Sequence, residues 1–171
     1  MITCQYCGAS YQKMQPTCSG CGAILRPKEN ITVNTTIPGR VRQICEEYED
    51  AKDFQPGNAV SQGKLRTAEK TFKVFPKNRE IFLFCDTHPL NKGKRGFMVC
   101  DDGLYWHNNW ATRSNRNYLS WDDFVKRELA LEGFTLHLGR GDAIGIAGLG
   151  SDEKREKALR LLTEIKNTLM E

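Results

Sequence analysis

The sequence lacks any long apolar run. No stretch of its 171 residues approaches the ~20 consecutive apolar residues that a membrane-spanning helix requires. The first residues, Met1-Ile2-Thr3-Cys4, also lack the basic segment and apolar run that together mark a secretory signal peptide. Low-complexity tracts are absent as well. We therefore expect a cytoplasmic protein.

The chain also has little excess charge. It holds 25 Lys and Arg residues against 21 Asp and Glu residues, a formal net charge of +4. If four cysteine thiolates bind one Zn²⁺, as argued below, the net charge falls to about +2. This balance is weaker than the strongly basic character of most nucleic-acid-binding domains.

Cysteine is present, but in a pattern that argues against disulfides. A disulfide framework is rare in the cytosol, and four of the seven cysteines fall into two identical short motifs near the N-terminus. The motifs are Cys4-Gln5-Tyr6-Cys7-Gly8 and Cys18-Ser19-Gly20-Cys21-Gly22. The other three cysteines are scattered among apolar neighbours.

Two Cys-x-x-Cys-Gly motifs are typical of a structural metal site. Zinc prefers four soft ligands in a tetrahedron, and two intervening residues let one tight turn direct both sulfurs at one metal. The following glycine lets backbone N–H groups approach the thiolates. The predicted ligands are Cys4, Cys7, Cys18 and Cys21. A rubredoxin-like iron site would use the same ligands, whereas four cysteines leave no open position for catalysis.

Residues 1–25, MITCQYCGASYQKMQPTCSGCGAIL, resemble the short bacterial zinc ribbons that precede other domains. This resemblance implies one structural Zn²⁺ per chain and a module used for docking. It implies no enzymatic activity.

The middle of the chain predicts a linker followed by a helical connector. Residues 26–37 are polar and lack helical periodicity, so we interpret them as a linker. Pro38 then opens a helix, because proline suits a first helical position, and a second helix is expected over 59–75. The connector thus spans residues 38–78.

From residue 80 the hydrophobic period changes to two. Short strands are expected over 81–85, 96–100, 104–107, 118–121, 125–131, 134–138 and 142–147. A final amphipathic helix follows, with Ser151 as its N-cap. Many short, evenly spaced strands predict a sandwich or barrel, and the fold class is therefore α+β.

Seven strands and one helix, in this order, resemble a bacterial pleckstrin-homology-like (PH-like) domain over residues 79–171. The local sequences GFMVCDDGLYW, NYLSWDDF and SDEKREKALRLLTEIKNTL carry the resemblance. It implies an antiparallel β-barrel capped by the C-terminal helix.

The first hairpin loop of this domain, residues 91–96, is a candidate anion-binding site. In lipid-binding PH domains, basic residues of this loop bind inositol phosphates. The corresponding loop of this chain contains Lys92, Lys94 and Arg95. A solvated hairpin turn is the simpler alternative.

Two further surfaces are candidates for partner contact. A run of cations within and after the second helix could contact nucleic acid or an acidic partner, although a solvated helix face is the simpler interpretation. These cations are Lys64, Arg66, Lys70, Lys73, Lys77 and Arg79. Trp110 follows two asparagines in an expected loop and is a candidate interface aromatic.

No histidine, cysteine or carboxylate pattern assembles into a catalytic motif. We therefore expect a non-enzymatic binding or adaptor protein of the bacterial cytosol that acts on a protein partner or on a second copy of itself. Two alternatives stay open. They are nucleic-acid binding through the zinc ribbon and the basic helix 59–79, and anionic lipid recognition through the 91–96 loop.

The zinc prediction has a direct test. We expect one zinc ion per chain by elemental mass spectrometry, and we expect Cys7→Ser or Cys18→Ser to abolish it, because three ligands no longer close the tetrahedron. Cys45→Ser, outside the two motifs, is the control and should keep the metal. Iron in place of zinc, or full zinc in both variants, would show that the assignment is wrong.

Overall fold

The structure is a computed structural model, and it describes strands Ile2–Thr3 and Ser10–Tyr11 together with residues 36–171. The chain divides into two compact units, Met1–Asn34 and Thr35–Glu171. In the first unit, β1 (Ile2–Thr3) pairs antiparallel with β2 (Ser10–Tyr11). The remainder of the predicted ribbon, and residues 26–35 of the predicted linker, lie outside the described residues.

The second unit is α+β, as predicted. Its elements are, in chain order, α1 (Ile37–Tyr48), β3 (Phe54–Pro56), the 3-10 helix η1 (Gly57–Ala59), α2 (Gln62–Thr71), β4 (Ile81–Asp86), β5 (Gly96–Cys100), β6 (Gly103–His107), β7 (Tyr118–Ser120), α3 (Trp121–Phe124), β8 (Ala130–Glu132), β9 (Thr135–His137), β10 (Ala143–Gly145), the 3-10 helix η2 (Ala147–Leu149) and α4 (Asp152–Met170). Among the described residues, no helix combines the length and apolar character needed to cross a membrane.

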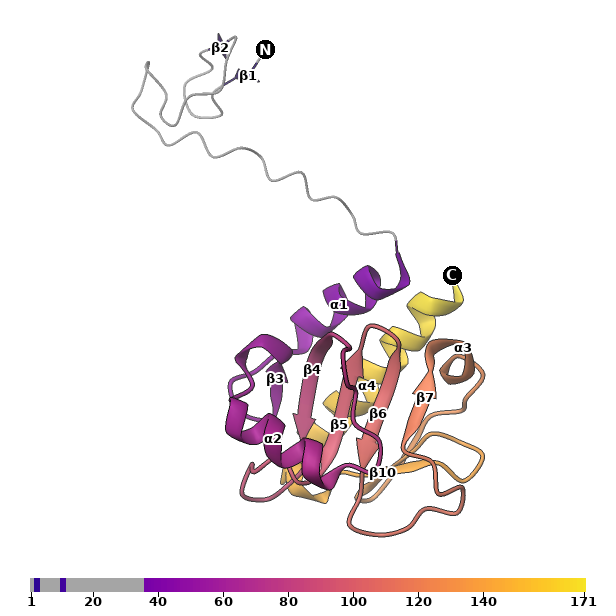
Figure 1. Cartoon of the computed structure of the whole chain (residues 1–171). Coiled ribbons are helices and arrows are strands. Elements are labelled where there is room, and N and C mark those ends of the chain that lie inside the picture. The colour runs from indigo at the N-terminus through magenta and orange to yellow at the C-terminus, as the bar shows by residue number, and fades with distance from the viewer. Residues whose placement is uncertain (1, 4–9, 12–35) are drawn as a thin grey trace. The chain divides into compact units, whose positions relative to one another are not determined.

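Two antiparallel sheets form the frame of this unit (Figure 1). The larger sheet has the order β3-β4-β5-β6-β7, and its last four strands form a meander. The smaller sheet has the order β10-β9-β8. Helix α1 packs against α4 and against β4, while α2 lies across the opposite face of the larger sheet.

The larger sheet is buried on both faces. On β5 and β6, Phe97, Val99 and Trp106 belong to the main core, which also contains the inner residues of α1, α4 and the smaller sheet. The alternate residues Met98 and Tyr105 belong to a second cluster beneath α2. Burial on both faces explains why these strands are continuous apolar runs instead of alternating sequences.

The closed barrel that the sequence predicted does not form. The described part of the chain contains two open sheets, because β7 pairs only with β6, and β8 only with β9. The expected fifth strand over 125–131 is also wrong in most of its length. Ser120 caps a helical turn by accepting the Asp123 N–H, and Trp121 and Phe124 bury their rings there, so only Ala130–Glu132 is extended.

The residues between α1 and α2 contain a strand that the sequence did not indicate. In β3, Phe54 is opposite Cys85 of β4, so this segment extends the larger sheet. Residues 38–78 therefore pack in the same compact unit as the two sheets. Helix α2 is shorter than expected because Phe72 already adopts an extended backbone conformation.

Asp50 organises the turn that leads from α1 into β3. Its Oδ1 accepts the backbone N–H groups of Lys52, Asp53 and Phe54, at 2.7 to 3.1 Å. Its Oδ2 lies 3.0 Å from Nζ of Lys157 on α4. Burial alone would raise the pKa of Asp50, but the three N–H groups and the ammonium outweigh it and lower the pKa to about 2.

This carboxyl makes folding stability depend on pH in the acid range. Because its pKa is lower in the folded chain than its ordinary value of 3.8, Asp50 stabilises fully above pH 4 and loses this effect as the pH falls toward 2. Its side chain is 35% exposed, so solvent screening limits the contribution to about 1 kcal/mol. Urea unfolding of the wild type and Asp50→Asn should differ by this amount at pH 5 and converge near pH 2.

The matched control is Glu156→Gln at an exposed position of α4. It should leave the free energy of unfolding within about 0.5 kcal/mol at every pH. A difference between the wild type and Asp50→Asn that does not change between pH 5 and pH 2 would refute this role of the Asp50 charge.

Candidate functional site

The predicted zinc ligands Cys4, Cys7, Cys18 and Cys21 lie outside the described residues. Among the described residues, no group of three or more His, Cys, Asp or Glu side chains is arranged to hold a metal. Cys45, Cys85 and Cys100 are buried and unbonded, and burial raises the pKa of each thiol far above its ordinary value. Such protonated thiols are unreactive core residues.

The six cations of the predicted basic surface differ in burial and in ion pairing. Lys64 is buried, with 9% of its surface exposed, and cannot contact a partner. Beyond the end of α2, Lys77 pairs with Glu69 at 3.6 Å, and Arg79 pairs with Asp102 at 3.1 Å.

The remaining cations of this set are exposed. Arg66 and Lys70 lie on the outer face of α2. Lys73 donates to the side chain of Asn115 at 2.9 Å, which joins the end of α2 to the loop after β6.

Lys64 forms a buried ion pair with Asp86 at the end of β4. Its Nζ lies 3.0 Å from Asp86 Oδ2, and the two side chains are 7% and 0% exposed. The ammonium also donates to Gln55 Oε1 at 2.7 Å and to Asn91 Oδ1. It lies 5.4 Å from the centre of the Phe84 ring. Each of its three protons therefore faces an acceptor, which a buried ammonium requires.

This ion pair fixes the hairpin loop between β4 and β5. Asp86 accepts the backbone N–H groups of His88 and Gly93, at 2.9 and 2.7 Å. Gly93 has a φ of +70°, and a Cβ there would lie 2.7 Å from Cγ of Lys64, so only glycine fits. Lys92 and Lys94 point to solvent, whereas Arg95 is half-buried.

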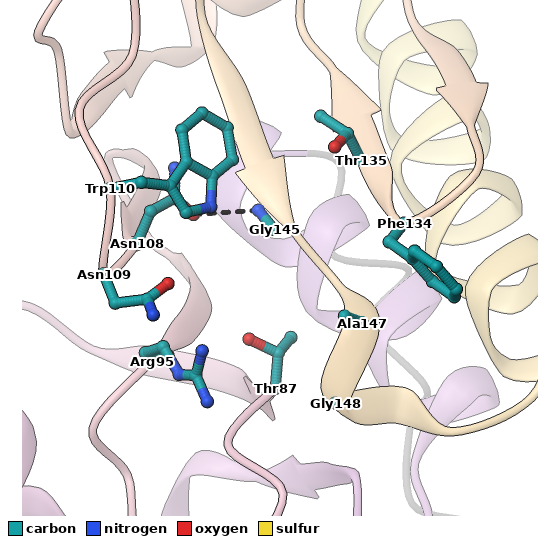
Figure 2. A pocket seen from close by; sticks show the side chains of 10 residues that line it. All are labelled: Thr87, Arg95, Asn108, Asn109, Trp110, Phe134, Thr135, Gly145, Ala147 and Gly148. Carbon is teal, nitrogen blue, oxygen red and sulfur yellow. Dashed lines mark hydrogen bonds between the residues drawn. The ribbon is translucent and has the colours of Figure 1, made fainter.

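Arg95 and Trp110 line the same hollow, which has a volume of about 150 Å³. The lining residues are Thr87, Arg95, Asn108, Asn109, Trp110, Phe134, Thr135, Gly145, Ala147 and Gly148. Figure 2 shows Arg95, Asn109 and Trp110 on one side of the hollow, and β10 with η2 on the other. The structure thus brings together two candidates that are 15 positions apart in the sequence.

Asn108 ties the loop after β6 to the edge of β10. Its Nδ2 donates to the carbonyl of Ala143 at 2.8 Å, and its Oδ1 accepts the N–H of Gly145 at 2.8 Å (Figure 2). The amide satisfies a donor and an acceptor of the strand edge, as a neighbouring strand would. Trp110, two residues later, is held beside β10 in consequence.

Two glycines, Gly145 and Gly148, let the segments that line the hollow approach each other closely. A Cβ at Gly145 would lie 3.1 Å from Nε1 of Trp110, so a larger residue would press on the indole. A Cβ at Gly148 would lie 1.8 Å from the carbonyl oxygen of Thr87, a distance that no side chain can occupy. The backbones of η2 and of the residue after β4 therefore meet directly at the base of the hollow.

Two exposed aromatic rings flank the hollow. Trp110 is 44% exposed and Phe134 is 60% exposed. The guanidinium of Arg155, a buried residue of α4, lies 4.8 Å from the centre of the Phe134 ring and supports it from one face. Sequence reasoning missed Phe134, because its alternation with Leu136 and Leu138 suggested a core position.

The loop beside the hollow has a positive character. The pKa of His88 is lowered, and burial of the imidazole is the largest cause. The charge of Arg95 lowers this pKa further, whereas the charge of Asp86 raises it by less. Neutral His88 accepts the N–H of Leu90 at its Nδ1, at 3.1 Å. The positive charge of the loop therefore comes from Lys92 and Lys94 at its tip and from Arg95 at the edge of the hollow, because a neutral His88 adds none.

Comparison with protein-family models, with curated proteins and with solved structures found no match for this chain. The site is accordingly described by its own geometry alone.

The buried ion pair predicts a large loss of stability on truncation. Asp86→Ala leaves the Lys64 ammonium buried without its counter-ion and removes the acceptor of two N–H groups, so we expect a loss of about 3–5 kcal/mol in the free energy of unfolding. Glu80→Ala breaks the exposed pair with Arg42, where the side chains are 52% and 45% exposed, and should cost less than about 1 kcal/mol. Similar losses for both variants in urea unfolding would contradict the assigned role of Asp86.

Proposed function

We propose that this protein is a non-enzymatic binding or adaptor protein that acts through protein–protein contacts. In this proposal, a Cys4 zinc ribbon in residues 1–25 precedes a PH-like domain, and both act in the bacterial cytosol. The observation that carries the proposal is the hollow that Arg95 and exposed Trp110 line from one side and exposed Phe134 lines from the other (Figure 2).

The PH-like assignment is supported by the order of the elements. A four-stranded meander, β4 to β7, is followed by a three-stranded meander, β8 to β10, and then by α4, the long helix that packs on the main core. Seven strands and one helix in this order match the resemblance drawn from the sequence. Helix α1, β3 and α2 are additions to that plan.

Protein contact is favoured by the residue types at the rim of the hollow. Tryptophan, phenylalanine and arginine are enriched in the energetic centres of protein interfaces, because each combines a large contact area with few rotatable bonds or with several donors. The hydrogen bonds of Asn108 to the backbone of β10 also hold the loop that carries Trp110, so little conformational freedom is lost on binding.

Nucleic-acid binding receives less support from the described residues. Of the six predicted cations, Lys64 is buried, and Lys77 and Arg79 already have carboxylate partners. Arg66, Lys70 and Lys73 are exposed and form no ion pair with any other described residue, and three cations are few for a surface whose affinity depends on phosphate neutralisation.

Affinity purification of the tagged full-length chain from its native host tests the proposal. We expect protein partners that persist after nuclease treatment. Their recovery should fall at least ~10-fold in the double variant Trp110→Ala with Phe134→Ala, because interface aromatics of this kind often carry 2 kcal/mol or more of binding energy each.

Met170→Ala is the matched control, since Met170 is as exposed as Phe134, at 65%, but lies at the end of α4. It should leave recovery unchanged. Partners lost on nuclease treatment would favour the nucleic-acid alternative. Recovery that is indifferent to Trp110 and Phe134 would refute the hollow as the contact site.

A further inference from the structure

We propose that the hollow between Arg95 and β10 binds a carboxylate group of the protein partner, an Asp or Glu side chain or a chain terminus, with Trp110 and Phe134 covering the apolar atoms beside it. This inference rests on the proposed function and names the chemistry that its site recognises. It follows from the donors, the charges and the size of the hollow.

The polar groups in the hollow include three with unpaired N–H donors. Within the described part of the chain, the guanidinium of Arg95 has no ion pair, and neither the Nε1–H of Trp110 nor the side-chain amide of Asn109 has a hydrogen-bond partner. Figure 2 places these three groups along one wall. A guanidinium is the side chain best suited to carboxylates, because its N–H groups form a planar fork.

No carboxylate lines the hollow to compete with such a ligand. The two acidic residues that anchor the surrounding loops are already neutralised. Asp86 is paired with Lys64 at 3.0 Å, and Asp142 is paired with Arg127 at 3.0 Å, with both side chains of each pair buried. Lys92 and Lys94 add positive charge at the tip of the adjacent loop. The charge of Arg95 is therefore unbalanced where a ligand would enter.

The size of the hollow suits a small group. Its volume of about 150 Å³ is below the ~300 Å³ at which sites for whole small-molecule ligands begin. Gly148 approaches the Thr87 carbonyl too closely for a side chain, and a side chain at Gly145 would press on the Trp110 indole, so both glycines limit this volume. A carboxylate with one or two methylene groups fits, and the flanking rings would contact the rest of the partner residue.

A membrane phosphate is a weaker fit for the same site. A lipid surface attracts several exposed cations at once, whereas the lining of the hollow contains one half-buried guanidinium, on the same wall as Trp110. The charged tip of the loop, with Lys92 and Lys94, lies outside the lining of the hollow.

The indole N–H signals of the ¹⁵N-labelled full-length chain provide the test. The chain has three tryptophans, so it gives three such NMR signals, and Trp110→Phe identifies the one that belongs to Trp110. Acetate is the probe, neutral acetamide is its isostere, and inorganic phosphate represents the lipid headgroup, all at constant ionic strength. We expect acetate to shift the Trp110 signal saturably, with affinity at least 5-fold above that of acetamide and of phosphate.

Variants of the two cations separate the hollow from the loop tip. Arg95→Gln should weaken acetate binding at least 5-fold, and Arg95→Lys should weaken it less, because the charge is kept and the planar fork is lost. Lys92→Gln, at the exposed loop tip, should change the affinity less than 2-fold. Thermal unfolding of each variant verifies that the fold is retained.

Three results would overturn the inference: no saturable shift with acetate, equal shifts with acetamide, or tighter binding of phosphate. The last result would assign the hollow to phosphate ligands and favour a membrane. Failure here differs from failure of the proposed function. If capture of partners depends on Trp110 and Phe134 while acetate does not bind, the adaptor function stands and only the carboxylate is excluded.

Discussion

The buried ion pair between Lys64 and Asp86 sets the geometry on which the candidate site depends. An ammonium and a carboxylate that are almost fully removed from water must satisfy each other and every remaining proton and lone pair. Here they do so by joining α2, β4 and the hairpin loop, and these contacts hold the loop in the conformation described above. Arg95 ends this loop, so its position is a consequence of the ion pair.

The other walls of the hollow are anchored in the same way. Asn108 binds the loop after β6 to the edge of β10, and the buried pair of Arg127 and Asp142 holds the turn that precedes β10. Ser114, later in the loop after β6, donates to the Asp142 carboxylate. The site is thus assembled from loops that are distant in sequence, each fixed by a buried polar group. Such preorganisation lowers the entropy lost when a partner binds.

The sequence predicted β4 to β7 of the larger sheet and the last helix well, because their apolar runs and turn residues are strong local signals. It did not predict β3, where Phe54 is a single apolar residue between a polar turn and a proline. It misread most of residues 125–131 as strand, because the helical turn before them depends on the Ser120 cap and on the burial of Trp121 and Phe124. A barrel was expected from the many short, evenly spaced strands and from the PH-like resemblance, whereas the described residues form two open sheets and α2 buries the second face of the larger one.

The candidate site was predictable only in part, for a related reason. Arg95 and Trp110 stood out individually, one as a loop cation and one as a loop aromatic. Their proximity depends on long-range contacts, since Gly145 belongs to β10 and Phe134 to the turn before β9, and no local pattern links either to the first hairpin. Lys64 was mispredicted in the opposite way. Its place in a run of cations suggested an exposed side chain, whereas it is buried in an ion pair with Asp86, 22 positions away.

The central claim is that the hollow is the contact site for a protein partner, and photo-crosslinking from its rim tests it most directly. Benzoylphenylalanine in place of Ala147, an exposed lining residue, leaves Arg95, Trp110 and Phe134 intact. We expect crosslinks to a protein, at peptides that carry an Asp, a Glu or the chain terminus beside the attachment point. Crosslinks to nucleic acid or lipid, or a yield no higher than from the same probe at Glu156, would contradict it.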